Sequence, residues 1–282
     1  MNIISSNNLF SIIIPTWNNL AYLQTCIRSI RKNSSFKHQI IVHVNEGADG
    51  TIEWLQHEQI MYSHSPKNIG ICFAVNLAAA LATSEYILYM NDDMYVLPEW
   101  DKQLFAAVQS IGHEDFMMSS TMIEPKNTNN PIVICDNYGT DLDNFDEEKL
   151  LTEYKNLEKS DWNGSTWPPV LISKSWWIKI GGFSSEFSPG MYSDPDLTMK
   201  LWNAGVREFR GVGNSLIYHF QAKSTGRVVK NDGRKMFKQK WGISANFFYK
   251  NFLKMGTPYK GNLPDYQKNI KIYFEKLRNK FF

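Results

Sequence analysis

FSIIIPTWNN, residues 10–19, places a continuous apolar run directly before a polar loop. A short run of β-branched residues without polar alternation is typical of a strand that is buried on both faces, as in a parallel sheet. From Leu20 to Lys32 the apolar residues recur at helical spacing. The stretch therefore predicts a buried strand, a polar loop and a helix that packs on the sheet.

The same order of strand, loop and helix recurs through the first third of the chain. Buried strands are expected at residues 40–44 and 86–90, with a shorter one at 61–63. Helices are expected at 51–58 and 70–82. Strands that alternate with helices form a mostly parallel sheet with helices on both faces, so the predicted fold class is α/β. Because ligands bind beyond the carboxyl ends of such strands, the site is expected at the loops 15–19, 45–51 and 91–93.

The second half of the chain is less regular. Residues 125–165 are rich in Asn, Asp and Glu and are predicted to form an insertion or a long loop. The other expected elements are, in chain order, a strand at 170–173, helices at 174–180 and 197–204, a strand at 214–219, and helices at 232–256 and 266–282.

The composition of the 282 residues is that of a folded globular protein, with 43% hydrophobic and 21% charged residues. The formal net charge of +2 gives no reason to expect nucleic acid as a partner, but it conceals an uneven distribution. Residues 1–222 carry 15 Lys and Arg against 25 Asp and Glu, whereas residues 223–282 carry 15 against 3. The basic C-terminal segment is therefore expected to contact an anionic partner.

The three cysteines, Cys26, Cys72 and Cys135, lie far apart in the sequence. A disulfide framework or a zinc cluster is not expected from this pattern, and a reducing compartment fits it better. The first residues lack the features of a signal peptide, and no stretch is apolar and long enough to span a bilayer. We expect a soluble, cytoplasmic chain.

Asn91-Asp92-Asp93 follows directly after the strand expected at 86–90. Paired carboxylates in such a loop suit a hard divalent cation such as Mg²⁺ or Mn²⁺, which takes its remaining oxygens from phosphates and water. The alternative is a turn or a helix N-cap before the apolar stretch at 97–108.

Asp194 and Asp196 flank Pro195 just before the helix expected at 197–204. Capping of that helix alone would explain both acids. The functional interpretation makes one of them a general base that takes a proton from a hydroxyl nucleophile. His219 ends an expected strand and is either a metal ligand or a histidine satisfied within the fold.

Asn68, Gly70 and Asn76 lie at the start of the helix expected at 70–82. Gly70 permits close backbone approach, and a helix N-terminus attracts phosphate. The glycine spacing is not that of a dinucleotide-binding fingerprint.

In their order along the chain, these segments resemble the inverting family 2 glycosyltransferases, which have the GT-A fold. The resemblance covers about residues 10–226. The matching segments are Ser11–Asn18 (SIIIPTWN), Val44–Thr51 (VNEGADGT), Asn68-Ile-Gly70 with Asn76, Leu88–Asp93 (LYMNDD), Gly181-Gly-Phe183, Ser193–Leu197 (SDPDL), and Tyr218-His219 with Ser224.

The resemblance implies a GT-A-type, Rossmann-like mixed and mostly parallel sheet flanked by helices. It implies a glycosyltransferase domain at 1–226, with a nucleotide-sugar half at 1–110 and an acceptor half at 111–226 that contains the insertion. Residues 227–282 would then form a basic helical C-terminal extension.

The resemblance also implies roles for individual residues. Asp93 and His219 would hold Mn²⁺ or Mg²⁺, and Asp194 would be the catalytic base, although Ser193 replaces the Glu usual in the family motif. Glu46 stands where the family more often has Asp to contact the base or ribose. The other residues implied to bind the nucleotide sugar are Pro15, Thr16, Trp17, Asn68, Gly70, Asn76, Asn91 and Asp92.

The activity implied is metal-dependent transfer of a sugar, with inversion, from a nucleotide-diphosphate sugar to a glycan or lipid-linked saccharide, as in surface polysaccharide synthesis. A UDP-sugar is the favoured donor. The alternatives are a sugar nucleotidyltransferase of similar architecture and a non-catalytic glycan-binding relative. Met191 and Tyr192, beside Asp194, are assigned a weak acceptor role.

Two further hypotheses concern the C-terminal region. Lys223 or Arg227 closes over the diphosphate as part of a mobile loop, or is simply a solvated charge. Residues 266–282 form a helix with basic residues around an apolar face, made of Ile270, Phe274, Leu277 and Phe281. Such a helix can lie on the anionic inner face of the membrane, or can dock on the catalytic domain.

Overall fold

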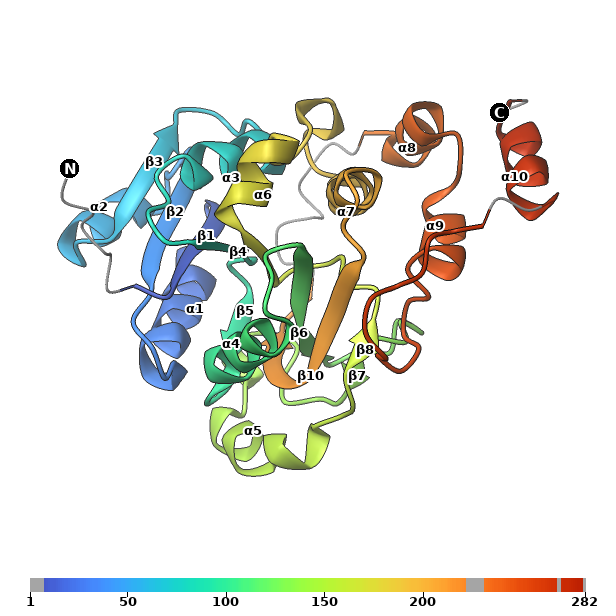
Figure 1. Cartoon of the computed structure of the whole chain (residues 1–282). Coiled ribbons are helices and arrows are strands. Elements are labelled where there is room, and N and C mark those ends of the chain that lie inside the picture. The colour runs from blue at the N-terminus through green and yellow to red at the C-terminus, as the bar shows by residue number, and fades with distance from the viewer. Residues whose placement is uncertain (1–7, 222–230, 268–269, 281–282) are drawn as a thin grey trace, which may run out of the picture.

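The computed structural model describes residues 8–221, 231–267 and 270–280. Over these residues the chain forms one mixed sheet of ten strands with helices packed on both faces (Figure 1). The strand order is β3-β2-β1-β4-β9-β6-β10-β5, with β7 beside β6 and β8 beside β10. The α/β fold class expected from the sequence is confirmed.

The first half of the sheet is parallel, as predicted. Strand β1 (Phe10–Trp17) lies between β2 (Gln39–Asn45) and β4 (Tyr86–Tyr89), and β3 (Met61–Ser65) lies at the edge. The connecting helices are α1 (Leu20–Asn33), α2 (Thr51–His57) and α3 (Ile71–Ala79). All four strands run in the same direction, so the loops at their carboxyl ends share one edge of the sheet.

The second half of the sheet contains the antiparallel pairs. Strand β9 (Val170–Ser173) is antiparallel to both β4 and β6 (Phe116–Glu124), and β5 (Met94–Val96) is antiparallel to β10 (Glu208–His219). Strand β6 was not expected, because its sequence FMMSSTMIE has few β-branched residues although all nine residues are buried. Strand β10 begins before the predicted 214, with an irregularity in register between Val212 and Leu216.

The expected insertion at 125–165 contains short elements of its own. These are β7 (Ile134–Cys135), α5 (Glu147–Glu153), β8 (Trp162–Asn163) and the 3₁₀ helices η1 (Leu142–Asn144) and η2 (Tyr154–Leu157). The remaining helices are α4 (Trp100–Ile111), α6 (Lys174–Ile180), η3 (Ser185–Phe187), α7 (Ser193–Asn203), α8 (Gly233–Trp241), α9 (Ala245–Asn251) and α10 (Ile270–Lys280).

Two helices differ from those predicted from the sequence. Helix α7 begins at Ser193 rather than at 197, so Asp194 lies inside its first turn. The single helix expected at 232–256 is two helices, because Gly242 adopts φ +72° and ends α8.

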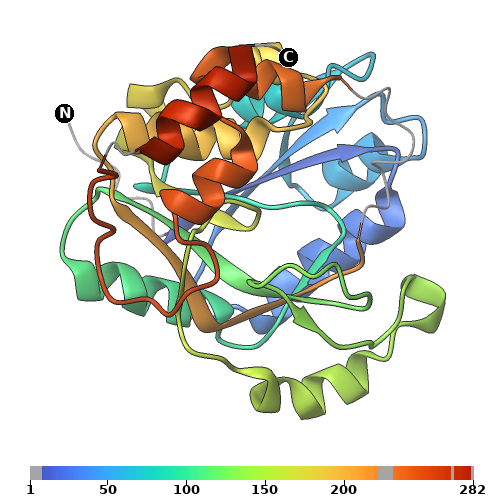
Figure 2. The same cartoon turned by 90° about the vertical axis from the view of Figure 1, so that its right-hand side faces the viewer.

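The sheet separates two large hydrophobic clusters. On one face, Leu23 of α1 and Leu104 of α4 pack against the sheet. On the other face, α3, α6 and α7 share one cluster with α8 and α9, which contribute Phe237 and Phe248. Figure 2 shows α8 and α9 beside the body of the molecule. Helices α8 and α9 of the C-terminal extension are therefore part of this hydrophobic cluster.

Gly70 lies in the turn before α3, at φ +79°, against residues 188–189. A Cβ at Gly70 would lie 2.7 Å from Pro189 Cα and would also overlap Ser188 Oγ. We expect Gly70→Ala to lower the free energy of unfolding by about 2–4 kcal/mol, because φ +79° with ψ +163° is a conformation almost restricted to glycine and because the Cβ would overpack the contact. Urea-induced unfolding followed by circular dichroism measures this loss.

Gly112 supplies a comparison, because it has φ +69° and ψ +17°, in the αL region, and nothing within 4 Å of a Cβ. Gly112→Ala carries mild backbone strain without a steric overlap and is expected to cost about 1 kcal/mol. Equal losses for the two variants would contradict the combined backbone strain and close contact at Gly70.

Candidate active site

A cavity of about 1150 Å³ opens where β1, β2 and β4 end. It exceeds the roughly 300–1,000 Å³ of a typical small-ligand site, so two substrates can lie in it together. Most of the residues predicted from the sequence line this cavity, namely Pro15, Thr16, Trp17, Asn68, Gly70, Asn91, Asp92, Asp93, Met191, Asp194 and His219.

Three predicted residues do not line the cavity. Glu46, at φ +64°, accepts a hydrogen bond of 3.0 Å from the loop after β1. Asn76 instead joins α3 to Phe183, since its side chain donates to the carbonyl and accepts from the N–H of that residue, both at 2.8 Å. Tyr192 precedes α7 at φ +70° and packs on Phe237. The structure therefore gives no support to cavity roles for these three.

Hydrogen bonds join the ends of β1 and β2 to the segments that follow β4 and β3. Thr16 Oγ1 donates to the buried Asp92 carboxylate at 2.7 Å. Asn45 Oδ1 accepts from the backbone of the turn that holds Asn68 and Gly70, at 2.9 Å. Asn68 Oδ1 accepts from the N–H of Gly70 at 2.9 Å. This end of the cavity is thus preorganised.

The turn before α3 is also joined to residues that precede α7. The N–H of Ile71 donates to the carbonyl of Pro189 at 3.0 Å, and Ser188 Oγ donates to the carbonyl of Ile69 at 2.9 Å. These bonds hold residues 188–190 against the first half of the sheet. They set Asp194, which follows a few residues later, across the cavity from the loops after β1 and β4.

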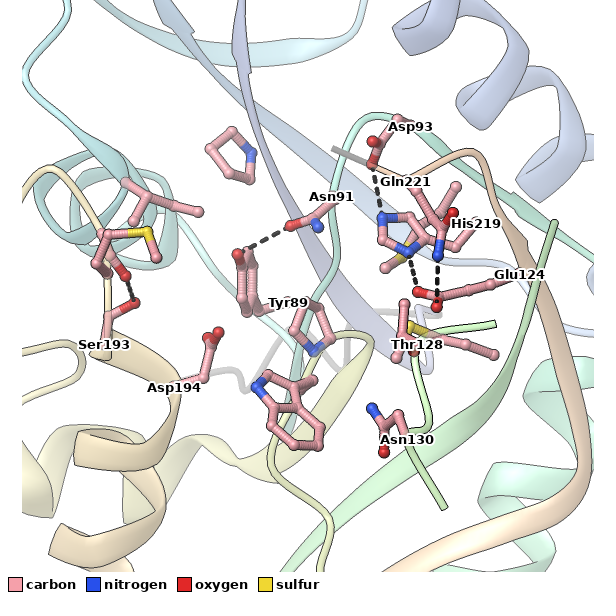
Figure 3. Close-up of a pocket in the computed structure, with 18 of the residues that line it drawn as sticks. Tyr89, Asn91, Asp93, Glu124, Thr128, Asn130, Ser193, Asp194, His219 and Gln221 are labelled. Atoms are coloured by element: carbon pink, nitrogen blue, oxygen red, sulfur yellow. Dashed lines mark hydrogen bonds and ion pairs between the residues drawn. The ribbon is translucent and has the colours of Figure 1, made fainter. Parts of the chain in front are cut away.

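Asp93 and His219 lie side by side on the cavity wall, where β5 and β10 pair (Figure 3). His219 Nε2 is 3.3 Å from Asp93 Oδ1, and its Nδ1 is 2.8 Å from Glu124 Oε1. Nε2 is buried, and Asp93 is its ion-pair partner in the described part of the chain. Burial lowers the pKa of His219, but the negative charges of Asp93 and Glu124 outweigh burial and raise that pKa to about 10.

This donor set fits a hard divalent cation. The bond from Nδ1 to Glu124 orients the ring so that Nε2 faces Asp93, which is the usual role of a carboxylate behind a metal-binding histidine. With a pKa of about 10 the ring is protonated at neutral pH in the absence of a metal, so a cation that bound Nε2 would displace its proton. The described residues contain no group of three or more His, Cys, Asp or Glu that would hold a metal by themselves. A pair of protein ligands suits Mg²⁺ or Mn²⁺, because phosphate oxygens and water complete the coordination.

Asp194 lies in the first turn of α7 and its side chain points into the cavity (Figure 3). Burial raises the pKa of Asp194 to about 7. Its side chain forms no capping hydrogen bond with α7, although Asp194 is one of the two acids in the first turn of that helix. A half-buried carboxylate that titrates near neutral pH suits a general base.

Asp196, by contrast, is part of the packing of the fold. It is fully buried, and its carboxylate accepts hydrogen bonds from Ser184 Oγ at 2.5 Å and Trp241 Nε1 at 2.9 Å. Lys240 Nζ lies 2.8 Å from the same carboxylate. With these partners Asp196 joins α7 to α8 and is not available as a base.

The sequence comparison identifies the family. Residues 11–165, more than half of the chain, match the profile described as Glycosyl transferase family 2. The chain belongs to glycosyl transferase family 2. The resemblance seen in the sequence motifs is confirmed, while no curated protein sequence matches the chain.

Solved structures confirm the GT-A glycosyltransferase fold. S. aureus TarS 1-349 matches with a TM-score of 0.57 and 15% identity, over 75% of this chain and 60% of TarS 1-349. TarS 1-349 in complex with UDP-GlcNAc matches with a TM-score of 0.56 and 14% identity, over 82% of this chain and 65% of the TarS chain. GalNAc-T7 with UDP, GalNAc and Mn²⁺ matches with a TM-score of 0.60 and 13% identity, over 86% of this chain and 50% of the GalNAc-T7 chain. This family 2 chain spans less than two thirds of each of these proteins.

Several residues that line the cavity were not predicted from the sequence. Glu124, behind His219, ends the unexpected strand β6. Trp167 also lines the cavity, and no motif in the sequence distinguishes it from the other aromatic residues. Asn246, Tyr249, Lys250 and Lys254 come from the C-terminal extension, which resembles no family motif. Lys223, Ser224 and Arg227 lie outside the described residues.

Proposed function

We propose that the chain is a metal-dependent, inverting glycosyltransferase that moves a sugar from a UDP-sugar to a hydroxyl of a glycan or lipid-linked saccharide, in the synthesis of a surface polysaccharide. One observation carries the proposal. Asp194, with its pKa near 7, faces the same cavity as the Asp93 and His219 pair. A base and a diphosphate site in one cavity are what sugar transfer to a hydroxyl requires.

The nucleotide occupies the end of the cavity formed by the loops after β1, β2 and β4. Trp17 and Thr16 border the base and ribose, and Asp92, held by Thr16, faces the ribose or donor sugar. The backbone of the turn at Asn68 and Gly70 lies beside the phosphates. UDP as the nucleotide is supported by TarS and GalNAc-T7, whose structures contain UDP or UDP-GlcNAc.

The diphosphate is held beside Asp93 and His219. These two residues would bind Mn²⁺ or Mg²⁺, which when bound neutralises the charge that develops on the leaving phosphate. Glu124 keeps the His219 ring in place through the bond to Nδ1. Mn²⁺ present in the GalNAc-T7 structure supports a divalent ion in this fold.

Asp194 accepts the proton of the acceptor hydroxyl as its oxygen attacks the anomeric carbon. The C–O bond to the leaving phosphate breaks on the opposite face, so the single displacement inverts that carbon. A carboxylate with a pKa near 7 is a stronger base than an ordinary aspartate and is still about half ionised at neutral pH.

Asp194→Asn removes the proton acceptor while keeping the size of the side chain. We expect kcat to fall by about 10³-fold, with the affinity for UDP and Mn²⁺ unchanged. In the wild type, kcat is expected to rise with pH through about 7 and then level off, because the base must be deprotonated. Steady-state release of UDP from UDP-GlcNAc and other UDP-sugars measures the fall in kcat and the dependence of kcat on pH.

Asp196→Asn is the control for this substitution. It disturbs the buried contacts with Ser184, Lys240 and Trp241, so it should lower the melting temperature and leave the pH profile of the remaining activity in place. Full turnover by Asp194→Asn, or a flat profile between pH 5 and 9, would exclude Asp194 as the base.

The location proposed for the enzyme is the cytoplasm, at the inner face of the membrane. In the described part of the chain, no helix has both the length and the apolar character for crossing a bilayer. Helix α10 instead leaves Ile270, Tyr273 and Phe274 more than 60% exposed, next to the exposed Lys271. Leu277, expected on the same face, is half-buried, and Phe281 lies outside the described residues.

The orientation of α10 supports membrane contact. Glu275 is buried and accepts hydrogen bonds from the N–H and Oγ of Ser244, at 3.0 and 2.6 Å. This anchor turns Ile270 and Phe274 outward. An exposed apolar strip bordered by lysines suits the surface of an anionic bilayer.

Ile270→Ser/Phe274→Ser tests the membrane contact by co-sedimentation with phosphatidylglycerol vesicles. Loss of two exposed apolar side chains is expected to weaken binding by about tenfold or more. Phe73→Ser/Leu77→Ser is the control, because these side chains are also exposed but lie on α3. Equal binding by both double variants and the wild type would contradict the proposal.

A further inference from the structure

The C-terminal extension forms one wall of the active-site cavity. The lining residues come from α9 and the turn after it, and are Asn246, Tyr249, Lys250, Lys254, Met255 and Thr257. Hydrogen bonds of 2.9 Å hold this turn to Asn163, whose N–H donates to the carbonyl of Thr257 and whose carbonyl accepts from Gly256. The wall is therefore an ordered part of the cavity.

This wall lies on the same side as the proposed base. Tyr249 packs edge-on against Trp167, with ring centroids 5.2 Å apart. Tyr249, Trp167 and Asp194 all line the cavity. Burial raises the pKa of Tyr249, and the charge of Asp194 raises it further. The acceptor hydroxyl must lie at Asp194, so this wall is assigned to the acceptor rather than to the nucleotide end at Thr16 and Trp17.

Lys250 and Lys254 bring positive charge to this wall. Both are exposed, and within the described chain neither forms an ion pair or a side-chain hydrogen bond. Lys240, one helix earlier, is by contrast paired with Glu186 and Asp196. Two unpaired lysines in a cavity that holds a substrate are available to bind an anion.

The position of Lys254 is unusual for a surface lysine. Its backbone has φ +47°, a left-handed conformation that costs a residue with a Cβ about 1–2 kcal/mol. The strain is tolerated in a turn that lines the cavity, the kind of place where strained residues cluster at functional sites.

We propose that the acceptor is anionic, and that Lys250 and Lys254 bind a phosphate or carboxylate group close to its accepting hydroxyl. This inference rests on the proposed glycosyltransferase function and names its acceptor class. Side chains of opposite charge then line the two ends of the cavity. The carboxylates Asp92, Asp93 and Glu124 lie at the donor end, where a divalent cation offsets them, and the lysines lie at the acceptor end.

Isothermal titration tests the inference with three sugars of similar size: glucose 6-phosphate, glucuronate and glucose. Each is titrated into the enzyme alone and into the enzyme saturated with UDP and Mn²⁺. We expect the two anionic sugars to bind at least about tenfold more tightly than glucose in the presence of UDP and Mn²⁺, because each gains charge-assisted hydrogen bonds. If glucose 6-phosphate binds more tightly than glucuronate, the anionic group of the acceptor is a phosphate, and the reverse order indicates a carboxylate.

Lys250→Gln/Lys254→Gln should abolish the preference for the anionic sugars and leave the affinity for UDP and Mn²⁺ unchanged. Lys260→Gln is the matched control, since Lys260 is an exposed lysine of the same extension that does not line the cavity. Equal binding of glucose and the anionic sugars by the wild type would overturn the inference. So would a double variant that binds UDP and Mn²⁺ more weakly but keeps the preference, because the lysines would then serve the donor diphosphate.

Failure of the proposed function gives a different result. In that case the wild type does not bind UDP with Mn²⁺ at all, while the titrations of the enzyme alone still report whether the lysines bind an anionic sugar.

Discussion

The close packing of residues 188–190 on the turn before α3 sets the spacing of the two halves of the active site. The two segments meet at Gly70 and Gly190. A Cβ on Gly70 would overlap Pro189, and a Cβ on Gly190 would overlap Ile71, so both positions require glycine. The bonds from Ile71 and Ser188 close the contact. Because Asp194 follows this segment directly, its distance from the Asp93 and His219 pair is fixed by backbone packing and not by the side chains that perform the chemistry.

The C-terminal extension stabilises the same arrangement from the other side. Gly233, at the start of α8, lies so close to the carbonyl of Met191 that a Cβ would not fit. Lys240 and Trp241 hold the buried Asp196 in the first turn of α7. Helix α7 is thus fixed at both its preceding loop and its first turn. The extension also contributes a wall of the cavity, so it belongs to the site as well as to the core.

The sequence predicted the parallel half of the sheet because its strands carry continuous β-branched runs, as in residues 10–14. The antiparallel half was harder to predict. Strand β6 buries methionines together with serines and a threonine. Its buried hydroxyl groups are satisfied by polar partners, such as Ser215 for Ser120. The roles of Asn76 and Asp196 depend on partners more than 40 residues away, Phe183 and Trp241, which no local pattern reveals. Glu124 and Lys250 were missed for the same reason.

In the proposed enzyme, Asp93 and His219 bind a nucleoside diphosphate together with a divalent cation. Thermal denaturation with UDP, with Mn²⁺ and with both tests it most directly. A ligand that binds only the folded state raises the melting temperature, and we predict a rise of about 5 °C that requires UDP and Mn²⁺ together and is lost in His219→Ala. A rise with UDP alone that His219→Ala keeps, or no rise with any combination, would contradict the account.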